Sequence, residues 1–348
     1  MANPNPRTGR FRMFVLMSLL IGPNLPFGYA QGSANNTGST GSAFLTIGVG
    51  ARAMGLAGAF GSLANDPTAL YWNPAGIASI DRIQFSFEHT WWVAEMRHDF
   101  VGAVIPLNEN FKVGVSVIYF SSGEIEITTI EQPKGTGSTY SAGDLALGGT
   151  LAWALTDDLS VGATLKYIRN DLYNLSATGL AFDAGAQFNT RFRSIAVALA
   201  VVNLGGQMQY AGPALNFQYP PPYPDAEPIE AQFTNTAFSI PLTYRASIQL
   251  EFFQFLGLSV SDHKADIGLD LVQRSDGLSQ LHLGAEYSFS GIVQVRSGYT
   301  FNADELGFCA GAGVHVPFEG IELETNYAFS MVRSFTGVHR LGIGVSLP

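Results

Sequence analysis

Long stretches of the chain alternate apolar residues with small or polar ones, which is the two-residue period of a β-strand. From Phe111 to Tyr119 every second residue is apolar, and the alternation returns at Leu281–Phe289 and Leu306–Phe318. The residues between them are largely Gly, Ser, Ala and Thr, whereas a soluble β-sandwich carries more charge on its outer face. This pattern is typical of strands that face lipid on one side.

The pattern predicts fourteen strands, an even number as in single-chain bacterial barrels. Their predicted ranges are 82–95, 98–107, 111–130, 140–155, 159–173, 175–189, 193–210, 241–252, 256–273, 278–289, 292–302, 305–318, 321–332 and 336–347. Connections after even-numbered strands are short, such as the predicted turn at 253–255, whereas the long connections at 131–139 and 211–240 follow odd-numbered strands. Because bacterial barrels place short turns in the periplasm and long loops outside, we expect an all-β, 14-stranded antiparallel transmembrane β-barrel with both termini periplasmic.

The first thirty residues have the pattern of a cleaved signal peptide. Three arginines precede an apolar run that starts at Met13, and the small residues Gly28 and Ala30 form a cleavage site of the A-x-A type before Gln31. Gly22, Pro23 and Pro26 interrupt the run short of the roughly 20 apolar residues that a spanning helix needs. We expect a signal peptide at 1–30 and export to the outer membrane.

The composition of the chain argues against several classes of function. Charged residues make up 13% of the chain, about half of the roughly 25% usual in soluble domains. Loss of residues 1–30 removes three arginines and no acid, so the net charge moves from −10 to −13, which argues against a nucleic-acid partner. Cys309 is the single cysteine, and no Cys/His spacing indicates a metal or another cofactor. His89 and His98 flank one hairpin, but we expect hydrated rim residues there and no enzyme activity.

One stretch departs from the strand pattern. Residues 48–78 read GVGARAMGLAGAFGSLANDPTALYWNPAGIA, which is glycine-rich, turn-prone and nearly neutral. Fourteen strands enclose more space than their own side chains fill, and the inward positions are often glycine, such as Gly284 and Gly298. Those glycines either make room or let the strands bend. We expect a plug segment at 31–81 inside a barrel formed by 82–348.

Local chemistry supports short, capped turns in this segment. Asp66 and Pro67 suit the start of a short helix, and the Asn73–Pro74 pair suits its end. Arg52 and Asp66 are the charges of the motif, and they are either solvated or paired with inward side chains. The candidate inward partners are Glu88, Lys166, Arg245, Glu251, Asp270, Glu286, Arg296 and Arg340.

The same stretch resembles the N-terminal signature of the PorV/PorQ family of outer-membrane proteins, relatives of the FadL-type barrels. The motif residues that carry the resemblance are Gly50, Arg52, Gly55, Asp66, Pro67, Asn73, Pro74 and Gly76. The PorV/PorQ resemblance implies a type IX secretion component that binds or shuttles exported proteins at the cell surface. A FadL-like role would instead imply passive transport of hydrophobic small molecules. Expected partners are outer-membrane lipid, exported proteins or other secretion components, and a hydrophobic small molecule in the second case.

The long connection at 211–240 contains a candidate partner or lid loop. Phe217, Tyr219 and Tyr223 flank a proline run that includes Pro221, and such a run favours a stiff polyproline conformation. A stiff aromatic loop exposes apolar surface at little entropic cost, which suits partner binding. The alternative is that it folds over the barrel mouth as a lid.

Overall fold

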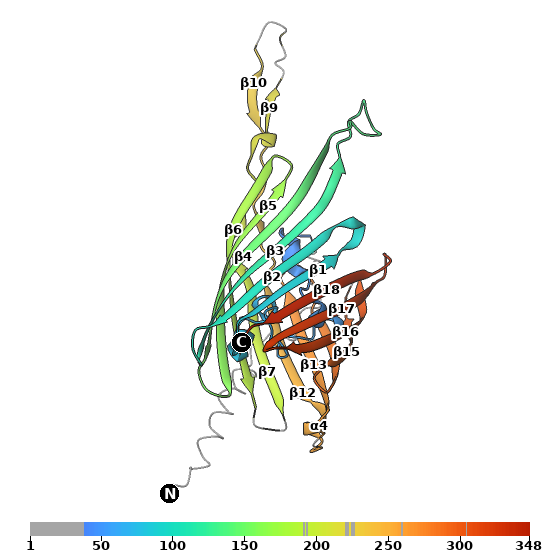
Figure 1. The fold of residues 1–348 in the computed structure, drawn as a ribbon. Helices are drawn as coiled ribbons and strands as arrows, with labels where there is room; N and C mark the ends of the chain where they lie inside the picture. The colour runs from blue at the N-terminus through green and yellow to red at the C-terminus, as the bar shows by residue number, and fades with distance from the viewer. Residues whose placement is uncertain are drawn as a thin grey trace. The chain divides into compact units, whose positions relative to one another are not determined.

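The strands form a closed antiparallel barrel in the computed structural model, which describes residues 38–190, 192, 194–219, 223, 227–258, 260–303 and 305–348. Within these residues fourteen strands surround the lumen, and β1 (Gln84–Trp91) pairs with β18 (Val338–Ser346) to close the barrel. β7 (Ile195–Gly205) pairs directly with β12 (Thr243–Glu251), because β8 to β11 lie in the connection between them (Figure 1). The predicted 14-stranded antiparallel barrel is confirmed.

Each barrel strand falls on a predicted range. The others are β2 (Arg97–Pro106), β3 (Phe111–Glu126), β4 (Thr139–Ala154), β5 (Leu159–Leu172), β6 (Leu175–Asn189), β13 (His263–Arg274), β14 (Gln280–Phe289), β15 (Val293–Phe301), β16 (Leu306–Phe318) and β17 (Ile321–Val332). The largest boundary error is at β13, which was expected to begin at 256. The chain there first forms α4 (Phe252–Phe255), capped by the Glu251 carboxylate, and Gly257 follows in the left-handed region with φ 74°. The predicted short turn is therefore a longer connection that contains a helix.

Side chains alternate with apolar groups outward and polar groups inward. In β15 the exposed positions include Val295 and Tyr299, whereas Arg296 and Thr300, which alternate with them, are buried. A water-soluble sheet has the opposite polarity, with its apolar face covered. The exposed apolar surface therefore suits a bilayer.

Connections at the two rims differ in length. We call the end of the barrel that carries connections 127–138 and 206–242 the long-loop rim, because both follow strands that run in the same direction. Connection 206–242 contains β8 (Gln207–Met208), η4 (Pro213–Leu215), β9 (Asn216–Tyr219), β10 (Ile229–Gln232) and β11 (Phe238–Ser239). The β9–β10 hairpin extends beyond the ends of β5 and β6 (Figure 1).

The chain before β1 forms short helical turns that pack against the inner face of the barrel. They are η1 (Ala43–Thr46), α2 (Ala51–Gly55), α3 (Ala69–Trp72) and η2 (Pro74–Ser79). We call residues 43–80 the N-terminal segment. Most of its apolar side chains are buried, including the fully buried Phe60 and Leu56, and they form most of the hydrophobic core. That this segment blocks passage through the lumen stays a prediction.

A short helix η3 (Val93–Glu95) lies in the connection between β1 and β2. In the described part of the chain, no helix has the length and apolar character needed to cross a bilayer. The predicted signal peptide at 1–30 lies outside the described residues.

Candidate functional site

The wall glycines contact the N-terminal segment. A Cβ placed on Gly284 would meet the Leu56 carbonyl oxygen at 2.7 Å, and one on Gly298 would overlap the backbone of Leu56. Across the barrel, a Cβ on Gly162 would overlap the backbone of Pro74, and one on Gly185 would overlap the side chain of Asn73. These inward glycines therefore allow the segment to approach the wall closely. The sequence alone did not decide whether they make room in the lumen or let the strands bend.

An ionic network holds α2 to the wall. Arg52 donates from Nε and Nη2 to the two carboxylate oxygens of Glu286, at 3.1 and 3.0 Å, and from Nη1 to Asp66 at 3.0 Å. Arg296 donates from Nε to Glu286 at 2.5 Å and from Nη1 to Asn326 at 2.6 Å. Burial by itself would lower the pKa of Arg52, but the carboxylates of Glu286 and Asp66 raise it well above its usual value. Arg52 is thus held as a cation between the segment and β14.

The other charge of the motif has a local role. Asp66 accepts hydrogen bonds from the backbone N–H and the hydroxyl of Thr68, at 2.9 and 2.5 Å, and its ion pair is with Arg52 rather than with a strand. Pro67 lies between Asp66 and Thr68. The carbonyls of Asp66 and Pro67 accept the first hydrogen bonds of α3. Asp66 therefore stabilises the start of α3 and is also the second carboxylate partner of Arg52.

The remaining motif residues shape the same turns. Asn73 caps η2 by accepting from the N–H of Ala75 at 3.1 Å, and its amide donates to the carbonyls of Gly61 and Ala186. Pro74 is the first residue of η2. Glycine is required at Gly50 by a φ of 89° and by the nearby Thr68 side chain. Gly55 approaches Gly311 and Arg296, and Gly76 lies against the Ala64 carbonyl. The structure brings all eight motif residues together within one segment.

Side chains of the wall also bond the backbone of the segment. Glu88 accepts from Ala51 N–H at 2.9 Å, and Asp270 accepts from Gly61 N–H at 2.9 Å. Arg245 donates to the Gly58 carbonyl at 2.9 Å and to Asp270 at 2.7 Å. Sequence reasoning named these three side chains but missed Gln187, His282 and Thr300, which contact the carbonyls of Ser62 and Ala57. Their inward positions on predicted strands were the available signal.

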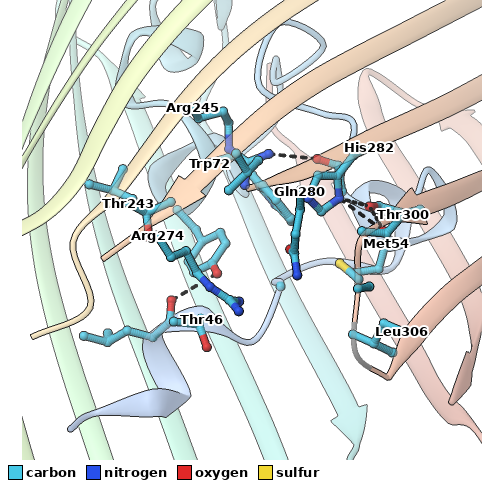
Figure 2. Close-up of a pocket in the computed structure, with 18 of the residues that line it drawn as sticks. Thr46, Met54, Trp72, Thr243, Arg245, Arg274, Gln280, His282, Thr300 and Leu306 are labelled. Carbon is cyan, nitrogen blue, oxygen red and sulfur yellow. Dashed lines mark hydrogen bonds between the residues drawn. The ribbon is translucent and has the colours of Figure 1, made fainter. Parts of the chain in front are cut away.

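A cavity of about 230 Å³ lies between the segment and the wall (Figure 2). Its apolar lining includes Leu45, Met54 and Trp72 from the segment, with Val272 and Leu306 from the strands. The strand residues lie near the long-loop rim, because β12, β14 and β16 begin there and β13 and β15 end there. The cavity is thus on the long-loop side of the segment.

Polar groups at the cavity wall are mostly paired. Arg245 stacks over the Trp72 ring at 4.6 Å, and His282 contacts the Ala57 carbonyl and the Thr300 hydroxyl at 2.6 and 3.2 Å (Figure 2). Tyr71 donates to the Leu45 carbonyl at 3.1 Å, and burial raises its pKa to about 12. The cavity is therefore suited to a compact apolar group rather than to acid–base chemistry.

The predicted loop residues lie apart from this cavity. Phe217 of β9 stacks on Phe233, with ring centroids 4.3 Å apart. Tyr219 and Tyr223 are exposed to 54% and 73%, and Pro221 lies outside the described residues. The structure thus presents aromatic side chains on the hairpin.

The two histidines of the β1–β2 hairpin lie on opposite faces of the barrel wall. His89 and Asp99 are paired at 2.5 Å, and His89 lies on the same strand face as Phe87 and Trp91, outside the lumen. His98 is buried inside the barrel, so the two histidines do not share a site. Among the described residues, no group of three or more His, Cys, Asp or Glu side chains could hold a metal ion.

Comparison with known proteins gives both a family match and a fold match. The model of the family described as type IX secretion system protein PorV matches residues 30–212, just over half of the 348 residues. A UPF0164 protein of Treponema pallidum (strain Nichols) is 27% identical over 166 residues, covering 45% of this chain and 42% of that protein. The match thus spans less than half the length of that relative.

Solved structures match over most of the chain at low identity. The CymD monoaromatic hydrocarbon channel has a TM-score of 0.54 and 13% identity, covering 86% of this chain and 96% of that chain. The Pseudomonas putida toluene transporter TodX has a TM-score of 0.50 and 11% identity, covering 80% and 92%. At these identities the comparison shows the fold alone.

Proposed function

Because the chain belongs to the family of the type IX secretion system protein PorV, we propose that it binds or shuttles exported proteins at the outer surface of the outer membrane. The barrel fold and the family together indicate the outer membrane. The proposed role is a binding role without catalysis. Both termini lie in the periplasm in this proposal, and the long-loop rim faces outward.

The packing of the N-terminal segment is the observation that carries this proposal. Its backbone bonds to β1, β12, β13 and β14, and the cavity beside it measures about 230 Å³. An extended polypeptide needs a continuous path, and the segment acts as a plug that closes it. Cargo therefore contacts the rim rather than passing through the lumen.

The β9–β10 hairpin is the proposed contact surface on that rim. Among the described residues its strands pair only with each other, so both outer edges of the two-stranded sheet are open there. Tyr219 and Ile229 face each other across the hairpin and are exposed to 54% and 59%. Open strand edges with exposed apolar side chains favour addition of a strand from a β-rich partner. The loop thus acts as a partner surface rather than as a lid.

The test is co-purification of the tagged barrel from its native membrane. We expect secreted proteins that share a C-terminal β-domain to be recovered with the wild-type barrel. The double variant Tyr219→Ser/Ile229→Ser should lose most of this recovery. Phe335→Ser is the matched control, because Phe335 is 53% exposed in the connection between β17 and β18 at the same rim.

Two outcomes would contradict the proposal. Wild-type barrels that recover no exported protein would refute the secretion role. Equal loss in the hairpin variant and in Phe335→Ser would keep the role but refute the hairpin as its contact surface. Heat-modifiable gel mobility shows that each variant barrel is folded.

A second candidate function is uptake of a hydrophobic small molecule. The cavity favours it, since an apolar cavity of about 150 Å³ can hold benzene in another protein and this one is larger. Toluene is a suitable probe because a similar barrel is described as a toluene transporter. Val272→Phe places a larger side chain in the cavity and should abolish saturable toluene binding, whereas Val115→Phe on the exposed face should not. Absence of saturable binding to the wild type excludes this function.

A further inference from the structure

The chain just before the N-terminal segment lies at the long-loop rim. Thr40 donates from its hydroxyl to the Asp276 carboxylate at 2.8 Å, in the connection between β13 and β14. Ser42 donates to the side-chain oxygen of Asn170 at 2.5 Å, near the end of β5. We call residues 38–42 the N-terminal strap. β1 starts at the opposite rim, because it runs in the same direction as β3, which ends at the long-loop rim. The chain between the strap and β1 therefore passes through the lumen from one rim to the other.

The strap is bonded to the returning half of connection 206–242. Thr40 forms a parallel bridge with Ser239 of β11, and the N–H of Gly41 donates to the Ser239 carbonyl at 3.0 Å. A Cβ on Gly41 would overlap the Phe238 ring, so the lack of a side chain there lets the strap lie against β11. β11 in turn pairs with β8. The strap, β11 and β8 together form the base of the connection.

This base is fixed because it packs into the hydrophobic core. Met208 of β8 and Ile240, which follows β11, are 1% and 4% exposed, and both belong to the core. The Ser42 hydroxyl contacts the Met208 sulfur at 3.6 Å. The Phe238 ring lies 5.4 Å from the Tyr210 ring. Because buried side chains are closely packed, the base cannot shift without disturbing its neighbours.

Hydrogen bonds continue from the base to the β9–β10 hairpin, which extends beyond the barrel strands (Figure 1). The Gln209 side chain donates to the Asn235 carbonyl at 2.9 Å, and the Asn235 side chain donates to the Tyr210 carbonyl at 2.6 Å. The N–H of Phe233 donates to the Leu215 carbonyl at 2.8 Å, next to the hairpin strands. These bonds join the two halves of the connection, so a shift of the base would be passed on to the hairpin.

The two halves of the connection have different anchors. The outgoing half is bonded to β6, where Ser176 and Ala211 exchange two backbone hydrogen bonds of 2.9 Å, whereas the returning half is bonded to β8 and to the strap. We propose that the strap positions the β9–β10 hairpin at the outer surface by fixing the returning half of its connection. A hairpin fixed at its base loses less freedom when a partner strand adds to it. That benefit rests on the cargo-binding role proposed above.

The mobility of a label on the hairpin tests the strap. A nitroxide is attached at Glu230→Cys, an exposed position of β10, in full-length Cys309→Ala barrels, which otherwise contain no cysteine. Thr40→Val keeps the shape of the side chain but removes the hydroxyl donor, and loss of one hydrogen bond should raise the mobile fraction of the label by about two- to tenfold. Gly41→Ala, whose methyl group displaces the Phe238 ring, should raise it further.

Controls separate the strap from a general loosening of the rim. Gly206→Ala lies in the same connection, but its methyl group meets nothing within 4 Å, so the label should keep its wild-type mobility. A label at Phe335→Cys instead reports the connection between β17 and β18. Glu305→Ala removes the two hydrogen bonds that Ser334 donates to Glu305, of 3.2 and 2.9 Å, and should mobilise this second label alone. Thr40→Val should mobilise the hairpin label alone.

An unchanged hairpin label in Thr40→Val and Gly41→Ala would overturn the proposal, as would an equal response of the two labels or an equal effect of Gly206→Ala. If Gly41→Ala fails to fold, as judged by heat-modifiable gel mobility, Thr40→Val decides the result. Recovery of exported proteins, measured on the same barrels, tests a different point. A wild-type barrel that recovers none refutes the cargo-binding role, whereas the label spectra still decide whether the strap positions the hairpin.

Discussion

Glu286 is the side chain whose loss should most weaken the attachment of the N-terminal segment. It accepts from Arg52 twice and from Arg296 once, and its side chain is 7% exposed. Glu286→Gln preserves the shape but leaves two buried guanidinium groups without their shared carboxylate. Removing one partner of a buried ion pair costs about 3–5 kcal/mol. The lower end applies, because Arg52 keeps its pair with Asp66 and is 15% exposed.

A loss of about 3 kcal/mol corresponds to a roughly hundredfold rise in the fraction of molecules with the segment detached. Arg52 is the single Lys or Arg between residues 38 and 81, so trypsin cleavage after Arg52 reports detachment directly. Under conditions where opening is fast relative to cleavage, the cleavage rate follows the detached population. We therefore expect cleavage after Arg52 to accelerate by about this factor in Glu286→Gln while the barrel stays folded.

The matched control is Glu322→Gln. Its ion pair with Arg82 is also 3.0 Å long, but the two side chains are 34% and 43% exposed, so the pair contributes about 0–1 kcal/mol. Cleavage after Arg52 should change little in this variant. If Glu286→Gln and Glu322→Gln gave equal cleavage rates, the ionic network would not hold the segment.

Two further predictions concern the segment. Gly284→Ala places a methyl group against the Leu56 carbonyl and should weaken attachment of the segment by about 1–3 kcal/mol. Gly149→Ala is the control and should be neutral, because the added methyl group meets nothing within 4 Å. Equal rates of cleavage after Arg52 in the two variants would contradict this packing. Because burial raises the pKa of Tyr71 from 10.0 to about 12, the buried phenol favours its protonated form, so segment stability should hold below pH 10 and fall as the pH rises towards 12. Tyr71→Phe should remove that part of the alkaline loss of stability and Tyr219→Phe should not, as measured by thermal unfolding between pH 9 and 12.

The barrel was predictable because each strand must present apolar side chains to the bilayer on one face. Outward positions such as Val295 and Tyr299 have to be apolar and inward ones do not, so a period of two runs through every strand. The start of β13 was not predictable in this way. Leu256, Leu258 and Val260 keep the alternation going through a connection that α4 and Gly257 divert from the sheet.

The interior was predictable only in part. Charged residues at inward positions marked Glu286 and Asp270 as partners for the segment, since an unpaired buried charge is costly. Pattern alone could not show which pairs form, and Asp66 bonds within the segment instead.

The contacts of the N-terminal segment also set an order of events in assembly. Its partners lie on β1, β6, β12, β13, β14 and β15, which are as far as 243 residues away along the chain, the separation between Ala57 and Thr300. Loops of that length close slowly compared with neighbouring hairpins, so strand pairing precedes these bonds. The part of the described chain that is synthesised first therefore reaches its final position last, after the strands have formed the surface that receives it.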